Sequence, residues 1–242
     1  MIDKKTTDKA RALYYGLLSK MFVYSTKEDR FEGIDDALAI ITTNPLDEHS
    51  ANAAKRLLEI IDTKGIDYLK EEFEVLFHLF YGKEVKTSAS YYLEGIEAGE
   101  KLVEVRSFLA RTNIRRDESF YKDNEDTIPF LLSFMKELIE EEMSGEKSYA
   151  NIEHCLFNEI INPFIDRFIE QLFNHEKSDA YKDVAIILNS FIEFERLYFE
   201  IARPAKQEVV KTKKELEYEK EMARRAANRA KKEADKFQKS YC

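Results

Sequence analysis

Glycine and proline are scarce in this sequence. The chain has 7 Gly and 4 Pro among 242 residues, well under half of the roughly 12% that these two residues contribute to an average protein. All-β sandwiches and barrels need many tight turns, and tight turns depend on glycine and proline. The shortage therefore excludes collagen-like chains, argues against an all-β fold and favours long helices.

Cysteines and long apolar runs are also few. The two cysteines, Cys155 and Cys242, do not form a framework of disulfides. The longest apolar run, from Ala12 to Leu18, is far shorter than the roughly 20 residues that span a bilayer. The N-terminal segment MIDKKTTDKARALYY has no apolar signal core. We therefore expect a protein without a transmembrane helix that stays in the reducing cytoplasm.

The common signatures of catalysis are missing as well. The sequence contains no glycine-rich phosphate loop, no His-Glu-x-x-His zinc motif and no Glu-x-x-His pair of the di-iron bundles. The four histidines are scattered, and His78, four residues after Glu74, is better interpreted as one side of a helix-face pair than as a ligand. We therefore predict no catalytic residue, no metal site and no cofactor.

The formal charge of −9 is distributed unevenly along the chain. Residues 205–242 hold 12 of the 38 Lys/Arg and 7 of the 47 Asp/Glu. The formal charge of the tail is therefore near +5 and that of residues 1–204 near −14. An acidic body argues against a general nucleic-acid surface and favours a cationic partner.

Apolar residues recur with a period close to 3.6 along nearly the whole body, and this period predicts helices. We predict an all-α fold: one helical domain of residues 1–204 with seven to nine helices and no strand. The predicted helices cover residues 12–22, 35–42, 51–61, 68–80, 96–109, 126–143, 152–172 and 178–201, with a further short one within 111–124.

Several local features refine this prediction. The most loop-like stretch between long helices covers residues 81–90. Asp126 is a good helix start, because its carboxylate can accept free first-turn N–H groups. Ser178 is predicted to cap the last helix, and the helix over 152–172 to tolerate or kink at Pro163.

Residues 205–242 are predicted to form a charged, mostly solvated helix. Apolar residues recur there every seven positions, but the companion stripe that a coiled coil requires is missing or polar. A weak helix-in-groove or coiled-coil contact is the alternative. The sevenfold repeat consists of Val209, Leu216, Ala223, Ala230 and Phe237.

Four short segments of the sequence form an ordered set. The segments are Leu13-Tyr14-x-x-Leu17-Leu18-x-x-x-Phe22, Glu72-Phe73-x-x-Leu76-Phe77, Ser90-x-Tyr92-Leu93, and Glu125-Asp126 followed by Phe134-Met135. Taken in this order, they resemble the TorD/DmsD/NarJ-type maturation chaperones of molybdenum-containing redox enzymes. The resemblance covers roughly residues 8–203, and the ordered set is more specific than any single piece.

The sequence also departs from the family pattern. Thr127 stands where the family usually has histidine, and Leu131 where it often has an acidic residue. Ile160-Ile161 and Phe164 map onto a family His-Leu and Trp. These changes remove any mechanism that needs a histidine at the groove, while isoleucine and phenylalanine preserve the apolar packing.

The resemblance implies an all-helical protein that is not an enzyme. Members of the family bind the twin-arginine signal peptide or the apoprotein of a molybdoenzyme catalytic subunit in the cytoplasm, and they hold export back until the molybdopterin cofactor is in place. Relatives serve nitrate, trimethylamine-oxide and dimethyl-sulfoxide reductases and formate dehydrogenases, and of these we favour a formate dehydrogenase. Both a monomer and a helix-swapped dimer are compatible with the resemblance to this family.

A signal-peptide receptor needs an acidic rim beside an aromatic groove, because the peptide has a cationic start and an apolar continuation. We predict that three carboxylates face the arginines, that three aromatic rings line the groove, and that Ser90 and Thr127 order the loop and helix start beside it. The carboxylates are Glu94, Glu125 and Asp126, and the rings are Tyr91, Tyr92 and Phe130.

Two other interpretations of the sequence stay open at this point. One is a helical adaptor or regulator that engages nucleic acid or an acidic protein through its basic tail. The other is a helical enzyme or metal protein that lacks the common motifs.

Overall fold

The computed structural model describes residues 3–24, 28–78, 84–118, 121–146 and 148–205, together with residue 217 and residues 220–225. Within these ranges the chain forms ten α-helices and no strand, so the all-α prediction is confirmed and the helix count is slightly higher than predicted. The helices are α1 (Lys4–Phe22), α2 (Ile34–Thr43), α3 (Glu48–Lys64), α4 (Ile66–Phe77), α5 (Ala89–Glu94), α6 (Glu100–Ala110), α7 (Ile128–Ser144), α8 (Tyr149–Leu156), α9 (Asn162–Phe173) and α10 (Ala180–Phe199).

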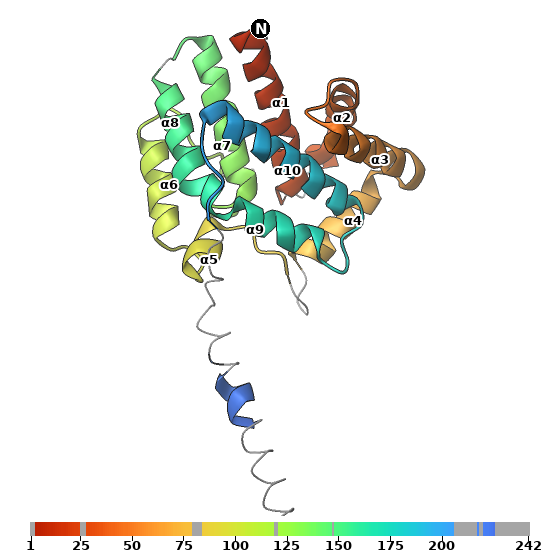
Figure 1. The fold of residues 1–242 in the computed structure, drawn as a ribbon, viewed down its shortest axis with the longest axis vertical. Coiled ribbons are helices and arrows are strands. Elements are labelled where there is room, and N and C mark those ends of the chain that lie inside the picture. The colour runs from red at the N-terminus through yellow and green to blue at the C-terminus, as the bar shows by residue number, and fades with distance from the viewer. Residues whose placement is uncertain are drawn as a thin grey trace, which may run out of the picture.

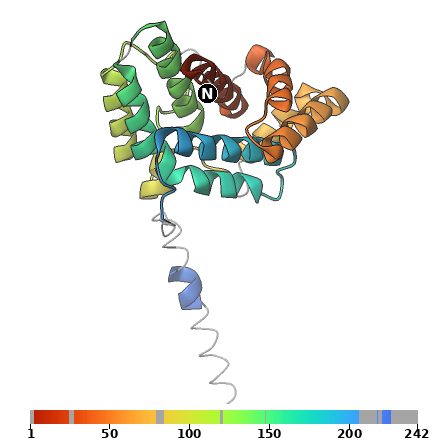
Figure 2. The ribbon, with the colours of Figure 1, turned by 45° about the horizontal axis from the view of Figure 1, so that its top comes forward.

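The helices are arranged around α1 (Figure 1). Helices α2, α3 and α4 lie on one side of α1, and α6, α7 and α8 lie on the other. Helices α9 and α10 cross both groups as a second layer, which the turned view shows from the edge (Figure 2). The most extensive pairings are those of α1 with α7 and of α10 with α3.

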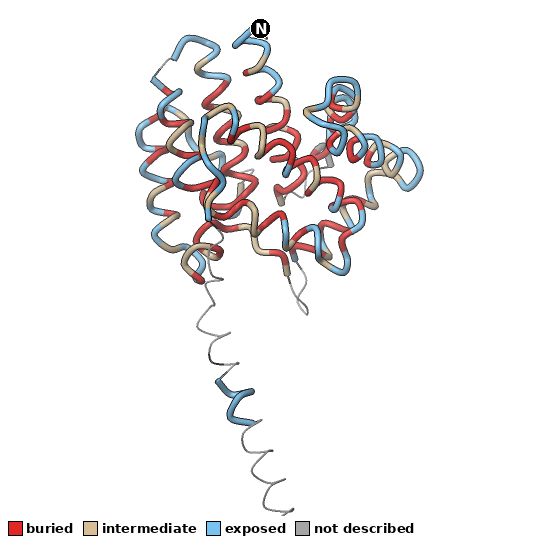
Figure 3. The backbone as a smooth tube through the Cα atoms, viewed as in Figure 1, coloured by how far each residue is buried: buried red, intermediate tan, exposed pale blue. Residues whose placement is uncertain are grey.

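Buried residues concentrate where α1, α7, α9 and α10 meet, while α2, α3 and α6 turn exposed faces outward (Figure 3). Large aromatic side chains fill this centre, and Phe22, Phe168 and Tyr181 are among those almost completely buried. The ring of Phe22 meets that of Phe168 edge-on with centroids 5.2 Å apart, a favourable geometry for aromatic pairs. No helix in the described ranges is long and apolar enough to cross a membrane.

The start of α10 is capped by a residue from another helix. The carboxylate of Glu72, on α4, accepts the backbone N–H groups of Asp179, Ala180 and Tyr181 at 2.7, 3.0 and 2.9 Å. The predicted cap, Ser178, is wrong, because its Oγ is buried without a hydrogen-bond partner in the described structure. A carboxylate at a helix N-terminus satisfies free N–H groups and opposes the helix dipole. Glu72 therefore fixes α10 against α4.

We expect Glu72→Gln to lower the free energy of unfolding by about 1–2 kcal/mol, because the amide loses the charge and one acceptor oxygen. Chemical denaturation followed by circular dichroism measures this loss. Glu71→Gln is the matched control, since Glu71 is exposed on the same helix. Equal stabilities of the two variants would contradict the capping role.

A π-helical turn, η2 (Phe157–Ile161), joins α8 to α9. It comes just before Pro163, in the first turn of α9. The N–H of Asn162 bonds to the carbonyl of Phe157, five residues back. Proline has no N–H to continue the helix and crowds the preceding turn, so the wider turn accommodates it. The structure thus divides the single helix predicted over residues 152–172 at this point.

Other boundaries also differ from the sequence prediction. Residues 89–94, predicted as the end of a loop and its aromatic continuation, form the short helix α5, and the described part of 111–124 is not helical. Residues 79–80, predicted as the end of a helix, lie outside the described residues. So does most of the predicted tail helix. Within the tail, residues 220–225 are helical and exposed.

Candidate peptide-binding site

Helix α5 is joined to the start of α7 by a short backbone bridge. Ser88 and Thr127 form an isolated antiparallel bridge. The N–H of Ala89 donates to the carbonyl of Asp126 at 2.8 Å, and that of Ile128 donates to the carbonyl of Thr87 at 2.9 Å. This bridge brings the two predicted segments, residues 90–94 and 125–130, next to each other.

Ser90 and Asp126 interact directly at this junction. One carboxylate oxygen of Asp126 accepts the Ser90 hydroxyl at 2.6 Å and the Ser90 backbone N–H at 3.1 Å. Asp126 therefore stabilises the first turn of α5. The prediction that it caps its own helix is wrong, since the N-cap of α7 is Thr127, whose hydroxyl donates to the carbonyl of Asn124. The other oxygen of Asp126, Oδ1, is buried without a hydrogen-bond partner in the described structure.

The side chain of Glu94 caps the next helix. Its two carboxylate oxygens accept the N–H groups of Glu100 and Lys101, each at 2.8 Å, at the start of α6. This contact explains Gly99, because a Cβ at position 99 would lie 1.8 Å from a Glu94 oxygen. Glu94 thus holds α6 against α5, and its carboxylate faces backbone donors of the chain itself.

The carboxylate of Glu125 is paired with arginines of the chain itself. Arg106 of α6 lies 3.0 Å from it, and Arg116 lies 3.5 Å from its other oxygen. Glu125 is 8% exposed, while the side chain of Arg106 is about half exposed. Each of the three carboxylates predicted to bind arginines therefore forms hydrogen bonds or ion pairs with other residues of the chain itself.

A groove with a volume of about 690 Å³ lies between α5, α9 and residues 203–205. Two of the predicted aromatic residues line it. We call it the tyrosine groove. Its lining residues are Tyr91, Tyr92, Pro163, Asp166, Arg167, Glu170, Gln171, Asn174, Arg203, Pro204 and Ala205.

Tyr92 forms the inner wall of this groove. Its ring stacks on Phe164 with centroids 5.6 Å apart, and its hydroxyl donates to the carbonyl of Lys86 at 2.9 Å and contacts Gln171. Burial raises the pKa of Tyr92 well above its ordinary value, so the hydroxyl stays protonated. Arg167 donates to the Tyr92 carbonyl and lies over its ring, 5.4 Å from the centroid. The more exposed Tyr91 packs edge-on against Tyr92 at the mouth.

A second, smaller hollow with a volume of about 240 Å³ is lined in part by residues 84–88. We call it the acidic pocket, because its carboxylates outnumber its single lysine. Lys86 pairs with Glu84 at 3.0 Å and with Glu97 at 3.7 Å. Burial lowers the pKa of Lys86, but the carboxylates of Glu84 and Glu97 raise it by a larger amount. The pKa of Lys86 therefore lies above its ordinary value. Asp123 and Thr127 complete the rim on the α7 side.

Phe130 does not share a cavity with the two tyrosines. It is buried between Tyr121 and Phe134, with centroids 5.4 and 6.3 Å away, and it lines a separate hollow of about 300 Å³. The predicted aromatic set is therefore divided between two places in the structure.

Residues 43–170, which run from the end of α2 through most of α9, match the nitrate reductase delta subunit family. The chain belongs to this family. Its members are the NarJ/TorD-type maturation chaperones of molybdoenzymes. No curated protein matches the chain.

Membership in the delta subunit family supports the chaperone interpretation of the sequence. The family consists of chaperones rather than catalysts, and its members interact with molybdoenzyme subunits. The protein is accordingly a molybdoenzyme maturation chaperone by family. The matched range includes α5, the start of α7 and the part of α9 that bears Arg167.

Four residues beside α5 were not predicted from the sequence. Arg167 and Gln171 fix Tyr92, and Glu84 and Glu97 surround Lys86. The first two are polar positions on a strongly amphipathic helix, and that pattern alone marks them only as outward-facing. Their place beside α5 depends on how α9 crosses the bundle.

Proposed function

We propose that the protein binds the twin-arginine leader peptide of a molybdenum-containing oxidoreductase in the cytoplasm, before export, and assists insertion of the molybdopterin cofactor. A formate dehydrogenase is the client that we favour. Family membership supports the maturation role, and the geometry beside α5 supports a peptide as the bound partner. Of the eight predicted residues, Tyr91 and Tyr92 line the tyrosine groove and Thr127 lines the acidic pocket, while Ser90, Glu94 and Asp126 hold the adjoining helices in place. Glu125 and Phe130 line neither hollow.

The observation that carries the proposal is the tyrosine groove next to the acidic pocket. Lys86 connects the two hollows: its side chain lines the acidic pocket, its carbonyl accepts the hydroxyl of Tyr92, and its ammonium lies 6.0 Å from the ring centroid of Tyr91. We propose that the apolar part of the leader lies against Tyr91 and Tyr92. Its arginines then reach Glu84, Glu97 and Asp123.

The surrounding contacts support these separate roles of the tyrosines and the carboxylates. Ser90, Asp126 and Glu94 hold α5 in position by the bonds described above, so the tyrosines are presented on a fixed element. Preorganisation of this kind lowers the entropic cost of binding a flexible peptide. The excess of negative charge on residues 1–204 attracts a cationic leader over a distance of about 8 Å at physiological salt.

Titration with a labelled peptide tests the proposal. The peptide carries a twin-arginine start and an apolar segment of about 12 residues, and fluorescence anisotropy reports binding. We expect Tyr91→Ala to weaken binding about tenfold at both low and high salt, because it removes apolar contact area. Glu97→Gln combined with Asp123→Asn is expected to weaken binding mainly at low salt, because salt screens charge attraction.

Tyr68→Ala is the matched control, since Tyr68 is a half-buried tyrosine on α4 that lines neither hollow. Affinity that is unchanged in Tyr91→Ala, or lowered equally in Tyr68→Ala, would contradict binding in the tyrosine groove. A leader with lysine in place of both arginines separates recognition of the guanidinium groups from simple charge attraction.

A further inference from the structure

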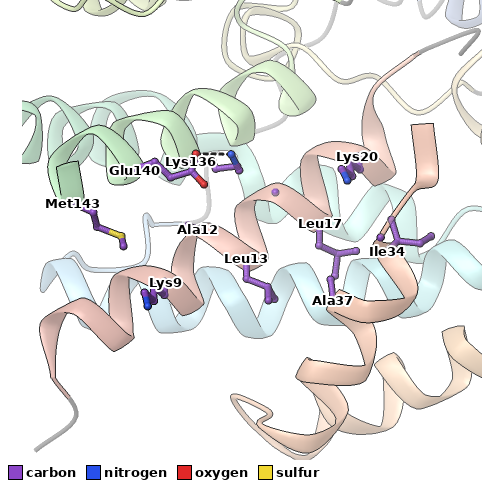
Figure 4. Close-up of a pocket in the computed structure, with 12 residues that line it drawn as sticks. Lys9, Ala12, Leu13, Leu17, Lys20, Ile34, Ala37, Lys136, Glu140 and Met143 are labelled. Atoms are coloured by element: carbon purple, nitrogen blue, oxygen red, sulfur yellow. Dashed lines mark hydrogen bonds and ion pairs between the residues drawn. The ribbon is translucent and has the colours of Figure 1, made fainter. Parts of the chain in front are cut away.

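A fourth hollow opens between α1, α2 and α7. Its volume is about 380 Å³, and apolar side chains dominate its surface (Figure 4). We call it the α1 groove. Its lining residues are Lys9, Ala12, Leu13, Gly16, Leu17, Lys20, Gly33, Ile34, Ala37, Lys136, Glu140 and Met143.

The floor of the α1 groove is apolar and partly open to solvent. Leu13 of α1 and Ala37 of α2 are half-buried, and Met143 of α7 is 36% exposed. Exposed apolar side chains that adjoin one another mark interaction sites more often than single ones do. The surface between these helices therefore presents apolar area that the chain itself leaves uncovered.

Gly16 helps to shape this groove. It lies in the middle of α1, where glycine costs about 1 kcal/mol of helix stability relative to alanine. A Cβ at this position would lie 3.3 Å from the aliphatic part of the Lys136 side chain. The missing side chain lets Lys136 lie across α1, where its ammonium pairs with Glu140 at 2.6 Å at the edge of the groove.

The charge around the α1 groove is opposite in sign to that of the body. Three lysines and one glutamate line it, whereas residues 1–204 as a whole carry a formal charge near −14. Lys9 forms no ion pair within the described residues, and the ammonium of Lys20 donates to the backbone carbonyl of Glu32. Neither lysine charge is therefore neutralised by a carboxylate there. The two lysines are 11 residues apart, about 16 Å along the helix.

We propose that the α1 groove binds a short amphipathic helix of a partner protein, with carboxylates flanking its apolar face. Three helical turns match the distance between Lys9 and Lys20, and the apolar face covers Leu13, Leu17 and Ala37. Charge selects this occupant over two others. A twin-arginine leader and the tail of this chain, which carries 12 Lys/Arg against 7 Asp/Glu, both have the wrong sign. This surface is additional to the leader site and does not depend on it.

The probe is a capped, labelled helical peptide of about three to four turns with a leucine stripe bordered by glutamates, measured by fluorescence anisotropy at low and high salt. Ala37→Trp fills the groove, and it is expected to weaken binding about tenfold at both salt concentrations. Lys9→Glu combined with Lys20→Glu is expected to weaken binding about tenfold at low salt and clearly less at high salt.

Matched controls lie outside the groove. Ala39→Trp adds the same bulk at an exposed position of α2, and Lys55→Glu reverses an exposed charge on α3. Both are expected to bind the probe as the unmodified protein does. A peptide with lysine in place of every glutamate is expected to bind at least tenfold more weakly than the acidic one.

Three results would overturn this proposal. The first is the absence of saturable binding of the acidic peptide, and the second is equal affinity for the acidic and basic peptides. The third is a dimer in light scattering that Ala37→Trp dissociates, because it would assign the groove to a second copy of the chain. Loss of leader binding in Tyr91→Ala with acidic-peptide binding intact would show that the two surfaces are separate.

Discussion

Replacement of Arg11 by methionine is expected to lower the free energy of unfolding by about 3–5 kcal/mol, the typical cost of removing one partner from a buried ion pair. The guanidinium of Arg11 is 1% exposed and lies at the centre of a charged cluster. It contacts both oxygens of Glu195 at 2.6 Å and also pairs with Glu153. Methionine would leave these two buried carboxylates without their cation.

The cluster links three helices that are far apart in sequence. Arg11 belongs to α1, Glu153 to α8 and Glu195 to α10, and the hydroxyl of Tyr15 also donates to Glu195 at 2.7 Å. The ring of Tyr198 covers the guanidinium with its centroid 4.0 Å away. The network therefore fixes α1, all of which lies outside the range matched by the family, against α8 and α10.

Urea denaturation followed by circular dichroism measures the effect. Arg11→Lys is also expected to be destabilising, because a single ammonium does not reproduce the planar fork that reaches both glutamates. Arg56→Met is the matched control: its guanidinium pairs with Asp183, but its side chain is 49% exposed, so we expect a smaller cost than for Arg11→Met. Similar losses for Arg11→Met and Arg56→Met would show that burial of the Arg11 cluster contributes little.

The second large effect concerns the pH dependence of stability. Burial raises the pKa of Glu153 to about 7, and Arg11 only partly offsets it. The unfolded-state pKa of a glutamate is about 4.3. A carboxyl group whose pKa is higher in the folded state stabilises the protein below the unfolded-state value, and this contribution is lost as the pH rises through the folded-state value. Between pH 5 and pH 8, ionisation of Glu153 should therefore cost stability.

We expect Glu153→Gln to remove this cost. The amide oxygen can still accept from Arg11, whose charge is then balanced by Glu195. The free energy of unfolding of Glu153→Gln relative to the unmodified protein is expected to increase by about 2–3 kcal/mol between pH 5 and pH 8.

Denaturation curves at several pH values test this expectation. Glu159→Gln serves as the control, because Glu159 is an exposed glutamate in the adjoining π-helical turn. A stability difference between Glu153→Gln and the unmodified protein that stays constant from pH 5 to pH 8 would contradict a raised pKa at Glu153. A pH-dependent difference shared by Glu159→Gln would point to net charge instead.

Periodicity and composition were sufficient to predict the class of fold. A repeat near 3.6 in the apolar residues is set by local helix geometry, so α1, α3, α7 and α10 could be placed to within a few residues or a turn or two. Helix α5 was missed because it has only six residues, too few for a periodic pattern. Its N-terminus is stabilised by Asp126, which lies 36 residues away.

The candidate site was predicted in part. The sequence placed residues 90–94 and 125–130 together through the family resemblance, and the bridge between Ser88 and Thr127 brings them together in space. The bonding of the acidic residues was not foreseen, since Glu94, Asp126 and Glu72 each cap a helix other than their own. Binding of a leader peptide by this site stays a prediction.

The helical class, the acidic body and basic tail, and the family could all be predicted from the amino-acid sequence. These properties depend on local periodicity, on composition and on ordered motifs, all of which can be read along one chain. The choice of carboxylates that cap helices, the neutralisation of Arg11 and the location of uncovered apolar surface became known from the three-dimensional arrangement of the helices. Those properties depend on contacts between residues far apart in the chain, such as Arg11 and Glu195, which are 184 positions apart, and such contacts leave no periodic pattern in a single sequence.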